Sequence, residues 1–299
     1  MNQWSFGIDR ELWRGSALEL QYLGSHSMHL DRNFFNNTPL PGPGPVNPRR
    51  PNPRFTVIRT IQNDVIANYE ALSVGVRQRM RRGLQFHASY TWAHTLDVTT
   101  DSNGGGTNMN PYNWRQDYGN SNWDIRHRLT GAFVYDVPFF ATSNRAVKFA
   151  FANWQMNGLF VAQTGLPFNV SIGTDTANTA SGGTYRPDLI AKPTADCGGH
   201  RLVSCITSSA FAVPQLYTYG NAGRNLLHGP GLFTIDYSVF KNFPLWERVG
   251  IQFRAEFFNL LNHPNFANPA STFNTGTFGS ITATRIENRD IQFGLKLYF

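Results

Sequence analysis

Apolar and polar residues alternate along most of this chain. The last nine residues show the pattern most clearly, with apolar side chains at Ile291, Phe293, Leu295, Leu297 and Phe299. Successive side chains of a β-strand point to opposite faces of a sheet, so a period of two predicts strands with one apolar and one polar face. The chain is therefore expected to be all-β.

Nine segments carry this alternation, arranged as four pairs and a closing strand. Their apolar sets fall within 4–8, 18–22, 72–76, 84–92, 129–137, 154–170, 233–239, 249–257 and 291–299. The connections within pairs are mostly short. Those between pairs are long and rich in Asn, Gly, Pro, Ser and Thr: roughly 25–67, 97–124, 172–231 and 262–290. A short additional strand is expected at 277–284, inside the last long connection.

Short turns at one end and long loops at the other are typical of outer-membrane barrels. No window approaches the ~20 continuous apolar residues that a spanning helix needs. Aromatic residues cluster near the expected strand ends: Trp13, Trp246, Phe139 and Phe140 on the short-turn side, Tyr90 and Trp92 on the long-loop side. The pattern favours an antiparallel up-and-down transmembrane β-barrel with two aromatic girdles. A β-sandwich with an aromatic core is the alternative.

The same alternation assigns side chains to the two faces of the barrel wall. Phe253, Phe257, Phe293 and Leu295 are expected to face lipid. The residues in the opposite phase include charged side chains that a water-filled or plugged lumen would accept. The lumen-facing candidates are Asp236, Arg254, Glu256 and Lys296.

Composition agrees with a membrane barrel and argues against a nucleic-acid partner. Aromatics make up 14% of the 299 residues and charged residues only 15%, whereas about 25% charge is usual in soluble domains. The net charge is +7, but the basic residues are scattered, and the densest run is "RQRMRRG" at 77–83. A solvated basic turn is the commoner reading of such a run, so no nucleic-acid binding is expected.

The two cysteines, Cys197 and Cys205, stand close together in "CGGHRLVSC". In an oxidising compartment such a pair can close a small loop, and a disulfide in the longest external loop is the favoured interpretation. A zinc site that also uses His200 is the alternative, but it has no clear fourth ligand. No metal ion or cofactor is therefore expected.

No constellation typical of an enzyme is found. The chain contains no G-x-S-x-G or H-E-x-x-H, and "GGG" at 104–106 is not followed by the Lys-Ser/Thr of a phosphate loop. The pair His26 and His29 has no acidic or cysteine partner nearby. Asp124 and His127, just before a strand, are better explained as a cap or hydrogen bond than as an acid–base pair. The chain is not expected to be an enzyme.

Two stretches resemble a known family. They are 220–266, "GNAGRNLLHGPGLFTIDYSVFKNFPLWERVGIQFRAEFFNLLNHPNF", and 277–299, "TFGSITATRIENRDIQFGLKLYF". Both resemble the C-terminal end of TonB-dependent outer-membrane receptors, particularly the Oar-like group, which carries a carboxypeptidase-regulatory-like domain at its N-terminus. "QWSFGIDREL", "YEALSVGVRQRMRRGLQFHASYTWAHTLD" and "DIRHRLTGAFVYDVPF" are similar to that group in the same order, so the resemblance covers nearly the whole chain.

The resemblance implies a bacterial outer-membrane barrel of about 22 strands with a plug inside it. It implies uptake of an external ligand, energised by TonB pulling on the plug, with outer-membrane lipid and the barrel-assembly machinery as partners. Phe299 would be the terminal aromatic that this machinery reads. The ligand cannot be named, because the long loops have only generic polar composition.

The chain shows no plug, TonB box or regulatory-like domain, so TonB would act only through a plug that these residues do not include. Residues 1–299 are therefore expected to be the C-terminal section of the barrel, a partial barrel of about nine to ten strands. An odd number of up-and-down strands leaves the two end strands parallel, so the section should not close regularly by itself. The alternative functions are a structural or adhesive outer-membrane barrel and a secreted carbohydrate-binding β-domain.

Overall fold

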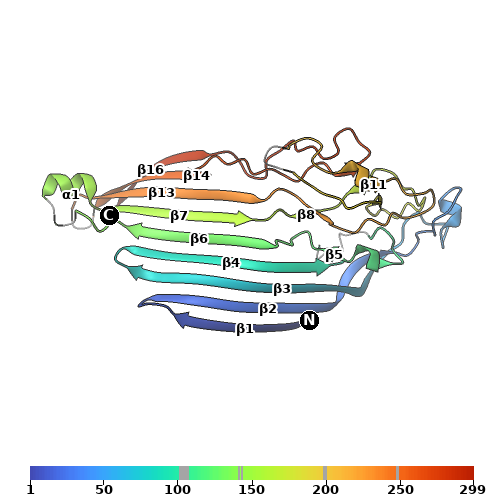
Figure 1. The fold of residues 1–299 in the computed structure, drawn as a ribbon, viewed down its shortest axis with the longest axis horizontal. Helices are drawn as coiled ribbons and strands as arrows, with labels where there is room; N and C mark the ends of the chain where they lie inside the picture. The colour runs from blue at the N-terminus through green and yellow to red at the C-terminus, as the bar shows by residue number, and fades with distance from the viewer. Residues whose placement is uncertain (101–107, 141, 143, 198–200, 247–248) are drawn as a thin grey trace.

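A computed structural model describes residues 1–100, 108–140, 142, 144–197, 201–246 and 249–299. The chain forms one large antiparallel sheet with a group of loops at one end (Figure 1). The long strands of the sheet, in their spatial order, are β1 (Asn2–Glu11), β2 (Ser16–Phe35), β3 (Arg59–Arg81), β4 (Leu84–Asp97), β6 (His127–Asp136), β7 (Trp154–Gln163), β13 (Leu232–Pro244), β14 (Gly250–Phe258) and β16 (Asp290–Tyr298). Each pairs with the next long strand along the chain, so the expected up-and-down order is confirmed.

Shorter elements lie in the connections. One helix, α1 (Arg145–Phe151), joins β6 to β7, and β5 (Gly119–Asn120) pairs with the end of β4. The other short elements are η1 (Asn47–Arg49), η2 (Trp114–Asp117), β8 (Pro167–Phe168), β9 (Ser171–Ile172), β10 (Asp188–Leu189), η3 (Ser208–Ala210), β11 (Phe211–Ala212), β12 (Leu227–His228) and β15 (Thr272–Phe273). Three small pairs result: β8 with β12, β10 with β11, and β9 with β15.

The two ends of the sheet differ as expected. One end carries the tight turns, α1 and the C-terminus, and the other carries the long loops (Figure 1). Because nine antiparallel long strands follow one another, β1 and β16 run in the same direction at the two edges of the sheet. No pairing joins these two strands in the described part of the chain, so the sheet is a partial barrel.

Three boundaries differ from the expectation. The strand expected at 154–170 ends at Gln163, and Pro167–Phe168 forms the separate short strand β8, which pairs with β12 outside the large sheet. β2 continues to Phe35 and β3 begins at Arg59, so the loop expected at 25–67 is shortened to 36–58. Their register shifts between Ser27 and Leu30, where a bulge leads into the extension. Beyond the bulge the hairpin no longer carries a clean apolar alternation, so the pattern that marks the other strands is lost.

The prediction of a short strand at 277–284 is wrong. Residues 274–279 form a turn instead, closed by hydrogen bonds between Gly279 N and Ala270 O and between Ala270 N and Ser280 O. Gly279 has a φ of +74°, which suits a turn and not a strand. Within 277–284 a single bridge, Thr284 to Phe266, is the only strand-like pairing described.

The strand registers gather the apolar positions on one face of the sheet. One row of directly paired residues crosses seven strands: Ile8, Leu20, Val74, Tyr90, Leu129, Ala162 and Phe233. Parallel rows hold the other apolar positions, and many of these side chains are exposed, including Phe6 at 65% and Leu295 at 74%. An exposed apolar face of this extent is typical of a membrane-contacting surface. We call it the apolar face.

Two glycines in the middle of the apolar face admit aromatic rings from the neighbouring strand. A Cβ at Gly131 would lie 2.1 Å from the ring of Phe160, and a Cβ at Gly158 would lie 2.2 Å from the ring of Phe133. The two pairs are reciprocal, since Gly131 faces Phe160 and Phe133 faces Gly158 across β6 and β7. Each ring covers the backbone of a glycine, a device that stabilises glycine in strands.

Candidate functional site

The four lumen-facing candidates share the face opposite the apolar one. The registers pair Glu256 with Ser238 and Lys296 with Gln252, in phase with Asp236 and Arg254. The Asp236 carboxylate accepts a hydrogen bond from Asn259 N at 2.9 Å. Arg254 Nε donates to Gln252 Oε1 at 2.7 Å, and its guanidinium lies 4.8 Å from the centre of the Phe240 ring. We call this the polar face; its exposure to a lumen stays a prediction.

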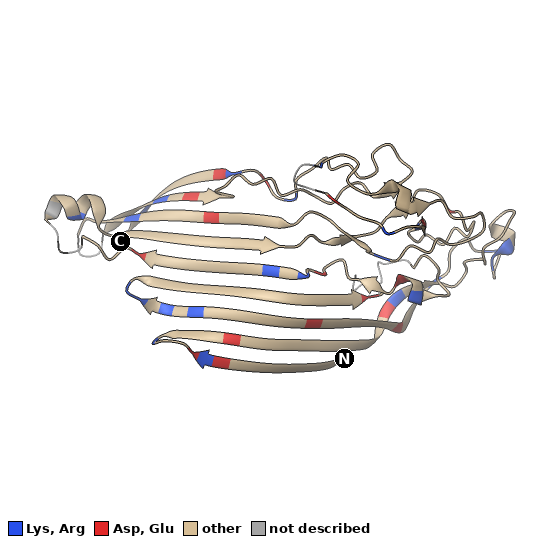
Figure 2. Cartoon of the chain, viewed as in Figure 1, with Lys and Arg blue, Asp and Glu red and all other residues tan. Residues whose placement is uncertain are grey.

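Charged residues are sparse along the middle of the long strands and are commoner at their ends and in the loops (Figure 2). Lys241, near the end of β13, was missed by the sequence pattern, because it lies in phase with Val239 and Phe243 on the apolar face. The chain covers it: Lys241 is 2% exposed and donates to Ala152 O at the end of α1. Its Nζ lies 5.2 Å from the Trp154 ring centre, so the ammonium is screened by aromatic side chains.

The long loops are packed together and are not structureless. Their core contains Phe168, Val170, Ile206, Phe211 and Leu227, and further loop residues pack against it. In the part of the chain that the structure describes, this cluster is the hydrophobic core, since much of the apolar face of the sheet is exposed.

The two cysteines lie in this loop assembly. Cys197 and Cys205 are joined by a disulfide, with Cα atoms 4.9 Å apart, and Cys205 belongs to the loop core. Formation of the bond in the cell stays a prediction. His200, the third member of the zinc alternative, lies outside the described residues. In the part of the chain that the structure describes, no group of three or more His, Cys, Asp or Glu side chains could hold a metal ion.

Ion pairs connect loop segments that are far apart in sequence. Arg186 and Asp117 are joined at 2.5 Å and are almost completely buried, and Arg224 reaches Asp97 at the end of β4, also at 2.5 Å. Burial raises the pKa of Tyr219 to about 12, so this tyrosine stays neutral inside the assembly. Paired buried charges impose geometry, so they fix how the loops lie on the strand ends.

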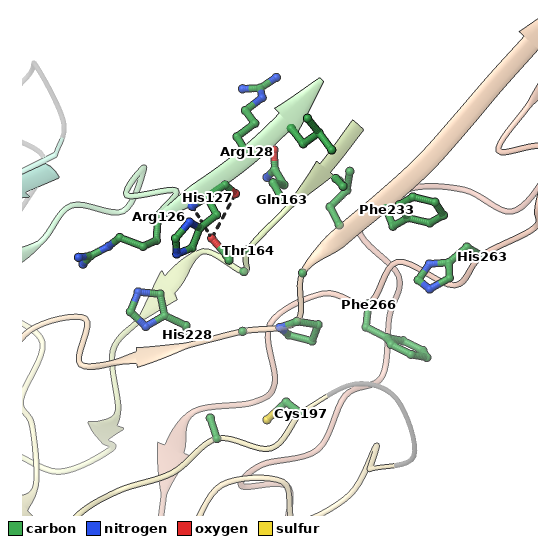
Figure 3. Close-up of a pocket in the computed structure, with 18 of the residues that line it drawn as sticks. Arg126, His127, Arg128, Gln163, Thr164, Cys197, His228, Phe233, His263 and Phe266 are labelled. Carbon is green, nitrogen blue, oxygen red and sulfur yellow. Dashed lines mark hydrogen bonds between the residues drawn. The ribbon is translucent and has the colours of Figure 1, made fainter. Parts of the chain in front are cut away.

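A cavity of about 1040 Å³ lies where the loop assembly meets the sheet. Its floor includes Tyr90, Leu129, Ala162 and Phe233, which stand side by side in one row on four adjacent strands of the apolar face. Its roof consists of loop residues, namely Ala195, Cys197, His228, Gly229, Pro230, Gly231, His263, Pro264 and Phe266 (Figure 3). This row places the floor on the apolar face, at the end that carries the long loops, while two further lining residues, Arg128 and Gln163, are paired with each other in the phase of the polar face.

The charged side chains that line the cavity are basic. Arg126, Arg128 and three histidines, His127, His228 and His263, are among the lining residues, and no Asp or Glu is among the described ones. The strand end beneath them is held by Thr164, whose hydroxyl hydrogen-bonds to the backbone of His127 (Figure 3).

One carboxylate stands behind this lining. Asp124 is fully buried and accepts a hydrogen bond from Thr95 N at 2.7 Å. Its Oδ2 lies 3.3 Å from Arg126 Nη2 and 4.0 Å from His228 Nε2. Burial raises the pKa of Asp124, but the interactions with His228, Thr95 N–H and Arg126 outweigh it, so the pKa is lowered. Among the described atoms, Arg126 Nε and His228 Nε2 are buried without a hydrogen-bond partner.

The other residues singled out in the sequence do not form a common site, and each makes its own contacts. Asp124 and His127 do not form a pair, since His127 Nδ1 lies 2.7 Å from the Tyr90 hydroxyl. His26 hydrogen-bonds to Asn68, and His29 lies 3.3 Å from the backbone of Asn63. The "GGG" segment lies outside the described residues. Phe299 is 95% exposed at the short-turn end, in phase with the apolar face.

The basic lining of the cavity was missed by sequence reasoning. Arg126, His228 and His263 come from three different connections, and nothing in the local pattern links them. Ion pairs, hydrogen bonds such as those between Asn120 and Asn225, and the loop core bring these segments together, and none of these contacts is visible as a motif.

Comparison with known proteins identifies the class. The family model of the outer membrane beta barrel domain matches residues 1–292, so the chain belongs to this family. Among solved structures, the outer membrane transporter YddB from Escherichia coli is similar, with a TM-score of 0.50 and 11% identity over 99% of this chain and 32% of that chain. The ferric-catecholate import receptor Fiu from E. coli K12 matches with a TM-score of 0.38 and 11% identity over 99% of this chain and 35% of that chain. No curated protein matches.

The chain is thus a domain of the bacterial outer membrane, folded as part of an antiparallel barrel. It spans about a third of the length of the solved transporters that it matches. In the described part of the chain, no helix has the length and apolar character to cross a membrane.

Proposed function

We propose that this chain is the C-terminal barrel section of a TonB-dependent receptor that takes up a ligand across the outer membrane. The observation that carries the proposal is the division of one continuous sheet into an apolar and a polar face, capped at one end by packed loops. A lipid-facing wall, a polar interior and a structured outer surface are what an uptake barrel requires. The fold similarity to an outer-membrane transporter supports the proposal.

The full receptor would contain about 22 strands and a plug, and residues 1–299 would contribute the last part of the wall. The free edges of β1 and β16 would pair with the rest of that wall, because open strand edges are not stable in lipid. TonB would act on the plug and not on this section. The Oar-like group is the subfamily that the sequence favours, and no catalytic role is proposed.

Phe299 would be read by the barrel-assembly machinery. Its ring is 95% exposed, it directly follows the edge strand β16, and it lies at the short-turn end that would face the periplasm. Asp236, Arg254, Glu256 and Lys296 would line the lumen, where water, the plug or the ligand would satisfy them.

The test uses the organism that encodes the full-length protein. A deletion of the gene and a deletion of tonB are compared with the parent strain, and depletion of compounds from a defined complex medium is followed by mass spectrometry. The proposal expects at least one compound to be consumed by the parent and left by both mutants. A structural or adhesive barrel would leave depletion unchanged in the gene deletion. A secreted β-domain would appear in the soluble fraction, without the heat-dependent gel shift of a membrane barrel.

A further inference from the structure

We propose that the cavity between the loops and the apolar face binds the phosphorylated headgroup of an outer-leaflet lipid, with the acyl chains lying on the wall below. This site is separate from the uptake path. The inference depends on the membrane location and on the assignment of the apolar face, and not on ligand uptake.

The position of the floor decides which compartment the cavity faces. Tyr90, Leu129, Ala162 and Phe233 form one row of the apolar face, which is the lipid-contacting side of the wall. A soluble ligand on its way through the lumen would meet the opposite face. The row spans three inter-strand distances, or about 15 Å, which is wide enough for a lipid headgroup.

The height of the floor along the strands also suits a headgroup. Ala162 is eight residues after Trp154, the first residue of β7, which lies beside α1 at the short-turn end. With a rise of about 3.4 Å per residue and a tilt of about 40°, Ala162 lies about 21 Å above Trp154. The apolar band of such barrels is about 25 Å tall. The cavity is therefore at the outer boundary of the band, where Tyr90 and Trp92 supply aromatic side chains.

The polarity of the cavity changes along the strand direction. Below it the apolar face continues through Gly131, Phe160 and Ile235, which form the next row on that face. Above it are the basic side chains of Arg126, His127 and His228, and no described acidic side chain lines the cavity. A lipid with an anionic headgroup matches this arrangement, with apolar acyl chains below and a negatively charged headgroup above.

The basic groups also have free hydrogen-bonding capacity. Arg126 Nε and His228 Nε2 lack partners among the described atoms, although both are buried. Asp124 lies 3.3 Å from Arg126 Nη2, on another nitrogen of the guanidinium, whereas at 4.0 Å it faces His228 Nε2 itself. The Arg126 side chain is 33% exposed, so its guanidinium is accessible to a phosphate in the cavity, with which arginine forms strong charge-assisted hydrogen bonds.

The experiment measures lipid binding by the full-length protein purified from the outer membrane and placed in nanodiscs of uncharged lipid. The probes are bisphosphorylated lipid A, its dephosphorylated form, and inorganic phosphate. Three variants are compared with the wild type. Arg126→Gln removes the charge, Ala162→Trp fills the floor without changing charge, and Lys192→Gln is the matched control, since Lys192 is an exposed loop residue outside the lining.

We expect the wild type to bind bisphosphorylated lipid A in preference to the dephosphorylated form. Loss of one charge-assisted contact should weaken that binding about tenfold in Arg126→Gln, and Ala162→Trp should weaken it at least as much. Lys192→Gln should match the wild type. The heat-dependent gel shift of each variant verifies that it has folded, and Ala162→Trp provides the test if Arg126→Gln fails to fold.

Three outcomes would overturn the proposal: equal binding of both lipid A forms, unchanged binding in a folded Arg126→Gln or Ala162→Trp variant, or saturable binding of inorganic phosphate alone without lipid A. The last result would indicate a site for soluble anions. Because lipid binding is measured without uptake, a failed uptake assay leaves this test intact, and the reverse also holds.

Discussion

Phe160 and Leu159 are adjacent on β7 but belong to opposite faces, so they offer a direct comparison of the two. Phe160 lies on the apolar face and packs against Gly131, whereas Leu159 is paired with Asp236 on the polar face. Replacing each by arginine introduces the same charge at positions one residue apart. The two variants therefore differ in the face that receives the charge.

The magnitude follows from the depth of the site. Phe160 is six residues beyond Trp154, which corresponds to about 16 Å for tilted strands in a band about 25 Å tall. At this depth an arginine on the lipid side costs about 2–4 kcal/mol, or roughly 30- to 900-fold in the folding equilibrium. Arginine at 159 would stand directly across from the Asp236 carboxylate, where an opposite-charge pair contributes about 0.2–1 kcal/mol. Leu159→Arg should therefore be close to neutral.

The assay is guanidinium unfolding of the full-length protein in phospholipid vesicles, followed by the heat-dependent gel shift. The outer-membrane level of each variant, measured at equal expression, provides a second readout. Phe160→Arg should lower both values strongly, and Leu159→Arg should leave both near the wild type. A larger loss in Leu159→Arg than in Phe160→Arg would refute the assignment of the two faces.

Three further predictions concern other parts of the molecule. Cys205→Ser should destabilise the external loop assembly by about 2–3 kcal/mol, as expected for a short closed loop, and should speed proteolysis of the loops. Free cysteines detected by thiol labelling of the unreduced wild type would argue against the disulfide. Phe299→Ala should lower surface levels in protease shaving while Phe299→Leu is affected less, and normal levels of the Ala variant would remove the assembly-signal interpretation. The pKa of Asp124 is lower in the folded protein than in the unfolded chain, where it is about 3.9. Its carboxylate therefore stabilises the loops at pH values above about 3.9, and this contribution is lost as the pH falls through the folded-state pKa. Thr95 N–H should therefore be better protected from hydrogen exchange in the wild type than in Asp124→Asn at neutral pH, and equal protection there would contradict the role of the charge.

The strands were predictable because lipid imposes a strict rule on them. A residue that faces lipid must be apolar, and the next one along the strand faces the other way, so Phe253 and Arg254 reveal their faces by spacing alone. The paired registers place these two residues on opposite faces, as the alternation predicts. The parallel direction of β1 and β16 followed from the number of strands.

The loops could not be predicted in the same way. Their structure depends on contacts between distant segments, such as Arg186 with Asp117 and Arg224 with Asp97, which leave no periodic trace in the sequence. The extension of β2 and β3 was missed for a related reason, since a strand outside the membrane needs no apolar face. Lys241 shows the opposite case, because α1 covers a charge that the apolar face would otherwise exclude.

The most direct test of the account is the accessibility of β14, measured by electron paramagnetic resonance in the full-length protein. A nitroxide is attached in turn to cysteines introduced at 252–257, and its collision with oxygen is compared with its collision with a water-soluble nickel complex. The proposed orientation of the wall predicts that labels at Phe253, Ala255 and Phe257 favour oxygen, and that labels at Gln252, Arg254 and Glu256 favour the nickel complex, with a period of two residues. A profile without alternation, or one with the two phases reversed, would contradict it.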